Sequence, residues 1–156
     1  MSVTRGVGSM EKSEMTNIFQ TNKVGILCLE DGAKPYGVPL EHYFDGKDLF
    51  FAASLKHGER KIDCIENNGN ACYVIYDSRR ENAELVKKDI RCRSVMAEGK
   101  VSLHAVREVE DKENGNVRLQ IIKLAVEQIE SWKCPRKKCH WHDQWFVRHP
   151  ELVADL

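Results

Sequence analysis

Apolar and polar residues alternate over most of this chain, and short turn sequences separate the alternating runs. Such runs are typical of half-buried β-strands joined by tight turns. Turns are expected at Asp31-Gly32, Asp45-Gly46 and Asn114-Gly115, because these pairs adopt the tight hairpin conformations readily. The pattern predicts about six strands, near residues 24–29, 35–44, 48–53, 71–76, 90–109 and 117–132.

Two segments have a helical period instead. Met15, Ile18 and Phe19 share one face of a short helix that Ser9 can cap and that ends near Asn22. A second helix is predicted over residues 59–67, with the sequence Asn67-Asn68-Gly69 as its stop. The polar run 77–89 is interpreted as a loop with at most one helical turn.

Three local features refine the strand pattern. Pro39 requires an edge, a bulge or a break in the ladder, because proline has no N–H to donate. Gly99 marks a bend or bulge in the run whose alternation continues through Val101, Leu103 and Ala105. A helix is the rival interpretation of residues 118–130, but the Asn114-Gly115 turn favours a hairpin.

These elements predict a mainly β fold, a six-stranded antiparallel barrel with short helices. Its length of 156 residues suits one domain. We expect a flexible N-terminal tail over residues 1–9, the barrel domain over 10–132, and a Cys/His/Trp-rich C-terminal segment over 133–156 that packs on the barrel.

Composition narrows the location and the partners of the protein. Lys plus Arg equals Asp plus Glu, 24 against 24, which disfavours nonspecific nucleic-acid binding. No run approaches the roughly 20 apolar residues of a membrane span, and the N-terminus has no secretory signal. The six cysteines are therefore expected to be reduced thiols in a cytoplasmic protein, with no membrane partner.

Candidate chemistry is concentrated in residues 37–67. The expected start of the second helix exposes unpaired backbone N–H groups, and Ser54, Arg60 and Lys61 add donors that suit a phosphate. The small residues Ala52 and Ala53 would let a flat ligand approach the strand before it. A solvated basic helix start is the alternative interpretation.

An ordered series of motifs resembles a known superfamily. The motifs are Tyr36-Gly37-Val38-Pro39-Leu40, the Asp45-Gly46 turn, Leu49-Phe50-Phe51-Ala52-Ala53-Ser54, Gly58-Glu59-Arg60-Lys61, Ile65-Glu66-Asn67-Asn68, and Arg93-Ser94-Val95 followed by Gly99. Together they resemble the FMN-binding split barrels of the pyridoxamine 5'-phosphate oxidase-like superfamily, nearest the nitroimidazole-resistance-type branch. The resemblance covers roughly residues 10–130 and implies a homodimer with two flavins in clefts between its subunits.

The resemblance also implies a set of cofactor-binding residues. Arg60 and Lys61 match the basic pair that grips the FMN phosphate, and Ala53 and Ser54 match the strand end beside the phosphate and ribityl chain. Pro39, Leu40, Glu41 and His42 match the strand whose backbone runs along the isoalloxazine ring. Ser94 matches a position on the neighbouring strand near the cofactor. His42 could instead be a barrel-rim histidine with one backbone partner, which is the interpretation we favour.

The chain also departs from the family pattern. The branch places a helix after the Ser-Val strand, whereas residues 106–117 are expected to form a turn. The arginine-and-leucine-rich strand and C-terminal substrate motif of the oxidases proper are not visible, so vitamin B6 is not implied as a substrate.

Four potential metal ligands lie after the last strand, at Cys134, Cys139, His140 and His142. Their spacing is irregular for a zinc site, so we assign no metal. The alternative interpretations are a basic loop without a ligand, a disulfide, or packing of the aromatic residues Trp141, Trp145 and Phe146 over the mouth of the barrel.

Three functions follow from these observations. The leading hypothesis is an FMN-dependent oxidoreductase, of nitroreductase or flavin-reductase type, that acts on a small molecule; no catalytic residue is identified. A non-catalytic flavin- or haem-binding module is the second. A metal-binding interaction protein that uses the C-terminal cluster is the third.

Overall fold

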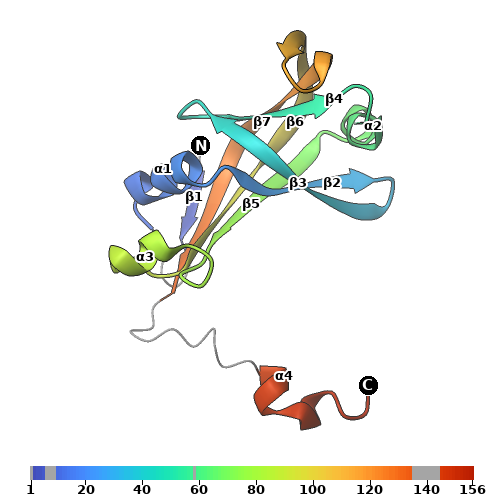
Figure 1. Cartoon of the computed structure of the whole chain (residues 1–156). Helices are drawn as coiled ribbons and strands as arrows, with labels where there is room; N and C mark the ends of the chain where they lie inside the picture. The colour runs from blue at the N-terminus through green and yellow to red at the C-terminus, as the bar shows by residue number, and fades with distance from the viewer. Residues whose placement is uncertain (1, 6–9, 58, 135–144) are drawn as a thin grey trace.

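The computed structural model describes residues 2–5, 10–57, 59–134 and 145–156. Seven strands and four helices follow one another along these residues, with a short 3-10 turn near the end (Figure 1). The strands are β1 (Ser2–Arg5), β2 (Val24–Asp31), β3 (Lys34–Phe44), β4 (Leu49–Ser54), β5 (Asn70–Asp77), β6 (Arg93–Asp111) and β7 (Gly115–Lys133). The helices are α1 (Lys12–Thr21), α2 (Glu59–Asn67), α3 (Ala83–Lys87) and α4 (Trp145–Arg148), and the 3-10 turn is Pro150–Leu152.

Strands β2 to β7 form a closed antiparallel barrel. Their order is β7-β4-β3-β2-β5-β6, and β6 pairs with β7 to close the ring. Strand β1 adds a parallel partner to β7, outside the ring. The predicted six-stranded antiparallel barrel with short helices is therefore confirmed.

The barrel interior and the inner faces of the helices make one apolar core. Met15, Ile18 and Phe19 of α1 are buried, as their shared helical face predicted. Strands contribute every second residue to this core, and Leu27, Tyr73 and Leu124 have no exposed surface. Cys64 and Ile65 of α2 are also buried against the core.

A buried ion pair joins the helical layer to the barrel wall. Arg93 Nε donates to Asp77 Oδ2 at 3.0 Å, and both side chains are almost fully buried. Asn17 of α1 accepts from the Arg93 guanidinium, and Asn82 donates to the second carboxylate oxygen of Asp77. The network thus satisfies both charges and fixes α1 and the loop before α3 onto β5 and β6.

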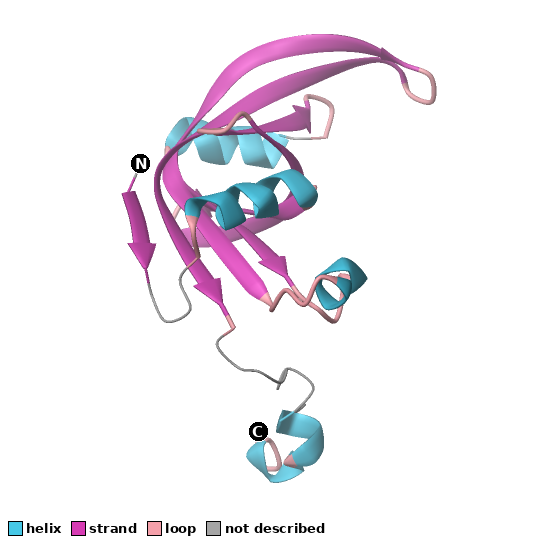
Figure 2. Cartoon of the chain, turned by 90° about the vertical axis from the view of Figure 1, so that its left-hand side faces the viewer, coloured by secondary structure: helices cyan, strands magenta, loops and turns pink. Residues whose placement is uncertain are grey.

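Strands β6 and β7 are long, and their hairpin arches beyond the barrel (Figure 2). Two irregularities bend this hairpin, and the first lies between Glu98 and Gly99. A Cβ atom on Gly99 would lie 1.9 Å from the carbonyl oxygen of Ala125, so only glycine fits this close approach. The predicted bulge at Gly99 is confirmed.

The second irregularity lies between Leu103 and Ala105, where His104 is an extra residue without a partner on β7. Leu103 pairs with buried Ile122, but Ala105 pairs with Ile121, which faces outward. The bulge therefore turns Ala105 and the residues after it to the opposite face. The predicted alternation through Ala105 is wrong beyond Leu103 for this reason.

The N-terminus and the β6–β7 turn differ from expectation. Residues 2–5 form β1 along β7, where we expected a flexible tail. Residues 106–111 extend strand β6, so the expected turn is limited to residues 112–114. Near the C-terminus, Trp145 and Phe146 of α4 are exposed, and α4 is drawn below the barrel in Figure 1. Within the described residues, no helix is long and apolar enough to cross a membrane.

Candidate functional site

The barrel is split where β3 leaves β4. Strand β3 pairs with β2 from Lys34 to Glu41, but with β4 only from His42 to Phe44. The N–H of His42 donates to Lys23 O, toward β2. The N–H and C=O groups of successive residues point to opposite sides of a strand, so those of Glu41 and the C=O of Pro39 point away from β2, toward the gap between β3 and β4. Because β4 does not pair with β3 at Pro39, the missing N–H of the proline removes no hydrogen bond between strands. This confirms the prediction that Pro39 marks an edge.

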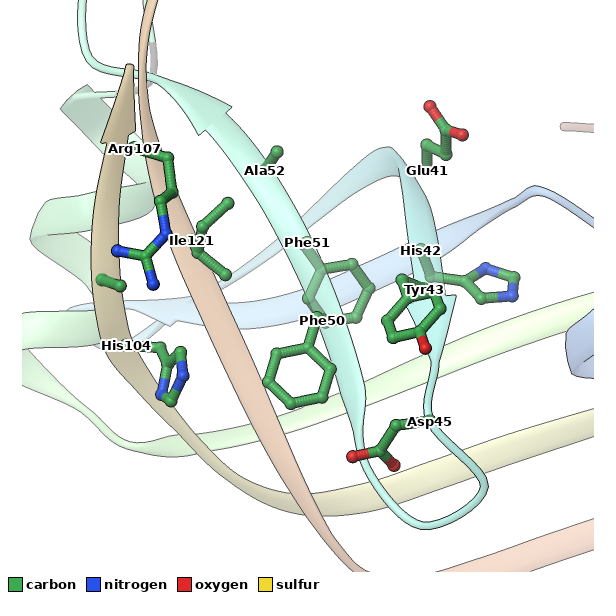
Figure 3. A pocket seen from close by; sticks show the side chains of 11 residues that line it. Glu41, His42, Tyr43, Asp45, Phe50, Phe51, Ala52, His104, Arg107 and Ile121 are labelled. Atoms are coloured by element: carbon green, nitrogen blue, oxygen red, sulfur yellow. The ribbon is translucent and has the colours of Figure 1, made fainter. Parts of the chain in front are cut away.

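An apolar pocket of about 510 Å³ lies on the outer face beside this split (Figure 3). We call it the aromatic pocket, because the Phe50 ring lies between Tyr43 and His104, with centroid distances of 6.3 and 5.7 Å. The small side chain of Ala52 leaves space over β4 beside Phe50, and Glu41 lines the pocket on the side of β3. Such a pocket suits a flat, largely apolar ligand.

The opposite wall of the aromatic pocket comes from the β6–β7 hairpin. His104, Ala105 and Arg107 face the pocket because of the bulge at His104. The buried amide of Gln120 braces the bulge, since its Nε2 donates to Ala105 O and Ile121 O, each at 3.0 Å. Arg107 has no carboxylate partner among the described residues, which leaves its positive charge available at the pocket rim.

A second pocket, of about 570 Å³, continues along the same strands toward the hairpin tip. We call it the basic pocket, because Lys56, His57 and Arg118 line it together with Ser54, and its lining contains no carboxylate. Arg118 is paired with Glu108 at 3.6 Å on the hairpin, whereas Lys56 and His57 have no side-chain partner in the described part of the chain. The pocket suits an anionic group.

The predicted basic pair lies at the start of α2 in two different settings. Arg60 is exposed, forms an ion pair with Asp31 at 2.9 Å and stacks on the Tyr36 ring at 4.0 Å. Lys61 is half-buried and has no hydrogen bond or ion pair within the described residues. Of this basic pair, Lys61 is therefore available to an anion, whereas the charge of Arg60 is already neutralised in part by Asp31.

Three of the predicted cofactor residues point into the barrel. Ala53 is buried, so its neighbours Ala52 and Ser54 face the pockets instead. Leu40 packs against the core, and His42 is only 7% exposed and points away from the aromatic pocket in Figure 3. Any ligand contact from Leu40, His42 or Ala53 would therefore be through the backbone.

His42 is fully engaged inside the barrel. Its Nε2 lies 2.7 Å from Phe19 O and its Nδ1 lies 2.8 Å from the Tyr73 hydroxyl. Burial lowers the pKa of His42, and this effect exceeds that of the Phe19 carbonyl, which raises it. The favoured interpretation, a barrel histidine with a backbone partner, agrees with these contacts.

Ser94 does not join the other predicted residues within one chain. It lies near the start of β6, opposite Tyr76 of β5 and Trp132 of β7. Ten residues separate it from His104 on the same strand, about 33 Å along an extended chain. Ser94 therefore does not line the aromatic pocket of its own chain.

Sequence reasoning missed Tyr43, Phe50, Lys56, His104 and Arg107, which line the two pockets. Phe50 could have been found, because residues that alternate with Ala52 and Ser54 share their face of β4. His104 and Arg107 had no comparable signal, since the bulge that exposes them interrupts the alternation.

Most of the C-terminal metal-ligand cluster lies outside the described residues, which include Cys134 but not Cys139, His140 or His142. Within the part of the chain that the structure describes, no group of three or more His, Cys, Asp or Glu side chains is arranged to hold a metal ion.

Comparisons with known proteins agree with this architecture. A family model described as pyridoxamine 5'-phosphate oxidase matches residues 11–137. No curated protein matches the chain by sequence. The motif resemblance to this superfamily is confirmed by the family match and by the structures below.

Three solved structures illustrate the shared fold. A proposed pyridoxamine 5'-phosphate oxidase of Listeria innocua superposes with a TM-score of 0.56 at 19% identity, covering 76% of this chain and 94% of its own. A proposed 5-nitroimidazole antibiotic resistance protein of Bacteroides thetaiotaomicron gives 0.55 at 16% identity, with 79% and 84% covered. An FAD-binding protein of Mycobacterium smegmatis gives 0.55 at 13% identity, with 80% and 98% covered.

Proposed function

Because the chain belongs to the pyridoxamine 5'-phosphate oxidase family, we propose that it is a cytoplasmic homodimer that binds FMN and uses it as an oxidoreductase on a small molecule. The observation that carries this proposal is the succession of the aromatic and basic pockets on one face of β4. Phe50, Ala52 and Ser54 share that face, and Phe50 and Ser54 are about 13 Å apart along the strand. That spacing suits a ligand with a flat ring at one end and a phosphate at the other.

The open edge of β3 fits the ring end of FMN. The pyrimidine edge of the isoalloxazine carries both hydrogen-bond donors and acceptors. The backbone of Pro39 and Glu41 points into the split beside the aromatic pocket, where β4 no longer pairs with it. This exposed edge can bind the ring without any specific side chain.

The phosphate end fits the residues between β4 and α2. Ser54 supplies a hydroxyl, His57 supplies a ring N–H, and Lys56 and Lys61 supply cations without a described partner. Arg60 joins them if it releases Asp31, which costs little because both side chains are exposed. FMN is favoured over an uncharged flavin because a phosphate would neutralise this cluster.

An apolar outer face supports the homodimer. Ile26 of β2 lies opposite Val74 of β5, which lies opposite Met96 of β6. Tyr76 and Trp132 flank Ser94 on the same face, and both are exposed together with Ile26. A second subunit on this face would bury these side chains and bring its Ser94 toward the flavin of the first subunit.

Bound flavin would supply reversible two-electron chemistry, which protein side chains cannot provide. The chain itself would hold the ring between Phe50 and the β3 edge, and would keep one side of the aromatic pocket apolar. His104 and Arg107 stand on the hairpin wall of the pocket, where a small substrate would meet the ring. Arg107 would favour an anionic or electron-rich substrate there.

The decisive experiment is a titration of the purified apoprotein with FMN and with riboflavin, which lacks the phosphate. Lys61→Ala should weaken FMN binding by about 10- to 100-fold, the equivalent of one charge-assisted hydrogen bond. Riboflavin binding should stay unchanged, because its ring contacts are intact. The matched control is Lys100→Ala, which removes an exposed cation on β6 away from both pockets.

The phosphate assignment is wrong if Lys61→Ala, Lys56→Ala and the double variant all bind FMN like the parent. Mass spectrometry of the cofactor released on denaturation then distinguishes FMN from FAD, and the absorption spectrum distinguishes flavin from haem. The homodimer is tested separately by sedimentation of Met96→Lys, which should be monomeric.

A further inference from the structure

Two cysteines face each other on the side of the barrel formed by β2 and β5. Cys28 and Cys72 are directly opposite in the antiparallel register of these strands. Their neighbours Leu27 and Tyr73 are fully buried, so both thiols point to the outer face, where each is half-buried and free. Opposite residues of an antiparallel pair have Cα atoms about 4.5–5.5 Å apart, which lies within the range of disulfides.

The two thiols also open onto a surface depression. Both line a cavity of about 380 Å³ whose walls carry three carboxylates, Glu30, Glu98 and Glu127, and the single cation Lys100. Lys100 donates to the side chain of Asn70, and Glu98 lies opposite Cys72 in the ladder. A reagent that reaches the thiols therefore passes through a negatively charged opening.

We propose that Cys28 and Cys72 form a modification site that is converted into a reversible cross-strand disulfide by exchange with a small neutral or cationic disulfide. This site is separate from the proposed flavin site, because it shares no lining residue with the aromatic or basic pocket. It lies two residues along β2 and β5 from Ile26 and Val74, next to the proposed dimer contact and on the side where the acidic cavity opens.

The exchange takes place in two balanced steps. The Cys28 thiolate attacks one sulfur of the small disulfide, whose S–S bond breaks, and one thiol leaves after gaining a proton. The Cys72 thiolate then attacks the sulfur of Cys28 and releases the second small thiol in the same way. Two electrons and two protons thus pass from the protein thiols to the small disulfide, which is reduced to two thiols.

The order of the two attacks follows from the surroundings of Cys72. Burial, followed by the neighbouring Cys28 and by Glu98, raises the pKa of Cys72 to about 12, which makes it the poorer first nucleophile. Once Cys28 is bound in the mixed disulfide, it no longer opposes ionisation of Cys72. The second attack is then favoured, because Cys28 and Cys72 are directly opposite in the ladder.

The test uses the full chain with Cys134→Ser and Cys139→Ser, which leaves Cys28, Cys72 and two buried cysteines, Cys64 and Cys92. This protein is incubated with cystamine, a dication, and digested for peptide mapping. We expect a Cys28–Cys72 crosslink, a mass loss of two hydrogen atoms and a higher Tm, all reversed by dithiothreitol. Cys28→Ser and Cys72→Ser should each stop at one mixed disulfide or none.

The charge of the opening is tested with a dianionic reagent, dithiodipropionate. At low ionic strength cystamine should react about tenfold faster, and salt should reduce the difference. Equal rates would overturn the assignment of a neutral or cationic disulfide. The site itself is refuted if the parent accumulates a stable mixed disulfide on each of Cys28 and Cys72, or crosslinks only between two chains.

Discussion

The hydroxyl of Tyr73 lies 2.8 Å from Nδ1 of His42, inside the barrel and directly beneath the strand that lines the aromatic pocket. The same hydroxyl lies 2.9 Å from Leu40 O, and the other ring nitrogen of His42 lies 2.7 Å from Phe19 O. These contacts join β3, β5 and α1. The open edge of β3 is thus held in place from behind by a polar cluster in an otherwise apolar core.

The proton positions in this cluster follow from its acceptors. A carbonyl can only accept, so Nε2 of His42 carries the proton toward Phe19 O. Burial lowers the pKa of His42, so the ring is neutral at physiological pH, and its Nδ1 faces the Tyr73 hydroxyl, whose one proton lies between Nδ1 and Leu40 O. Protonation of His42 would place a second N–H against the hydroxyl and a charge in the core.

We therefore expect the protein to lose stability as the pH falls below 6.5, the ordinary pKa of histidine. In the unfolded chain His42 takes up a proton near that pH, whereas in the folded protein it does so only at a lower pH. Unfolding is thus favoured through this window, and the contribution of His42 is complete above it. The measurement is Tm between pH 7.5 and 5.5.

The control is His42→Gln, which can still donate to Phe19 O but cannot be protonated. It should be less stable than the parent at pH 7.5, and the difference should narrow toward pH 5.5. A constant difference would mean that His42 does not titrate within this range. His57→Gln, at an exposed position, should leave the pH dependence unchanged.

Gly99 gives a second prediction, on the bend of the β6–β7 hairpin. Gly99→Ala would place a Cβ atom against the backbone of Ala125, which cannot move without opening the barrel seam. We expect the free energy of unfolding to fall by about 3 kcal/mol, as for an overpacked core. Gly69→Ala is the matched control, since its Cβ would meet Val101 O at an ordinary 3.5 Å. Similar denaturant midpoints for both variants would contradict this account.

The same hairpin shows what the sequence could predict and what it could not. Local signals sufficed for the six barrel strands, the two longer helices and the bulge at Gly99, because each depends on residues close in sequence. The bulge at His104 depends on Gln120, which lies on another strand and binds the carbonyl of Ala105. Alternation alone placed Ala105 in the core, and so the hairpin wall of the aromatic pocket was missed.

A parallel reason explains the partial prediction of the site. The motif that ends β4 pointed to the strand that lines both candidate pockets, but its side-chain directions depend on barrel closure, which buries Ala53 and exposes Ala52. The basic pair was located at the start of α2, but the ion pair between Arg60 and Asp31 joins residues far apart in the sequence. The local sequence pattern thus predicts where a strand or helix lies, whereas contacts between residues far apart in the sequence decide which of its side chains face the pockets.

The buried pair of Asp77 and Arg93 leads to a third prediction. Arg93→Met leaves the Asp77 carboxylate buried without its cation, so we expect the free energy of unfolding to fall by about 3–5 kcal/mol. The double variant Arg93→Met with Asp77→Leu should recover part of this loss, because no buried charge remains. Urea unfolding of the parent, Arg93→Met, Asp77→Leu and the double variant gives the coupling energy between the two side chains. Additive losses would show that the two side chains act independently.

The last prediction concerns Gln120, whose amide fixes the bulge that presents His104 and Arg107. Gln120→Leu keeps the volume but leaves the carbonyls of Ala105 and Ile121 without their donor, which should cost about 1–3 kcal/mol of stability. Because the bulge sets the face of residues 104–107, the same variant should also weaken flavin binding. Ser102→Ala, at an exposed position of β6 before the bulge, serves as the control.

Stability and binding separate the two roles of Gln120. If the variant loses stability but binds flavin like the parent, the hairpin wall does not contact the ring, and the flavin is held by β3 and β4 alone. If neither quantity changes, the bulge at His104 is fixed by the strand pairing itself, and the Gln120 amide is dispensable. We expect both to fall, because the Ala105 carbonyl that Gln120 satisfies belongs to the residue at which β6 changes face.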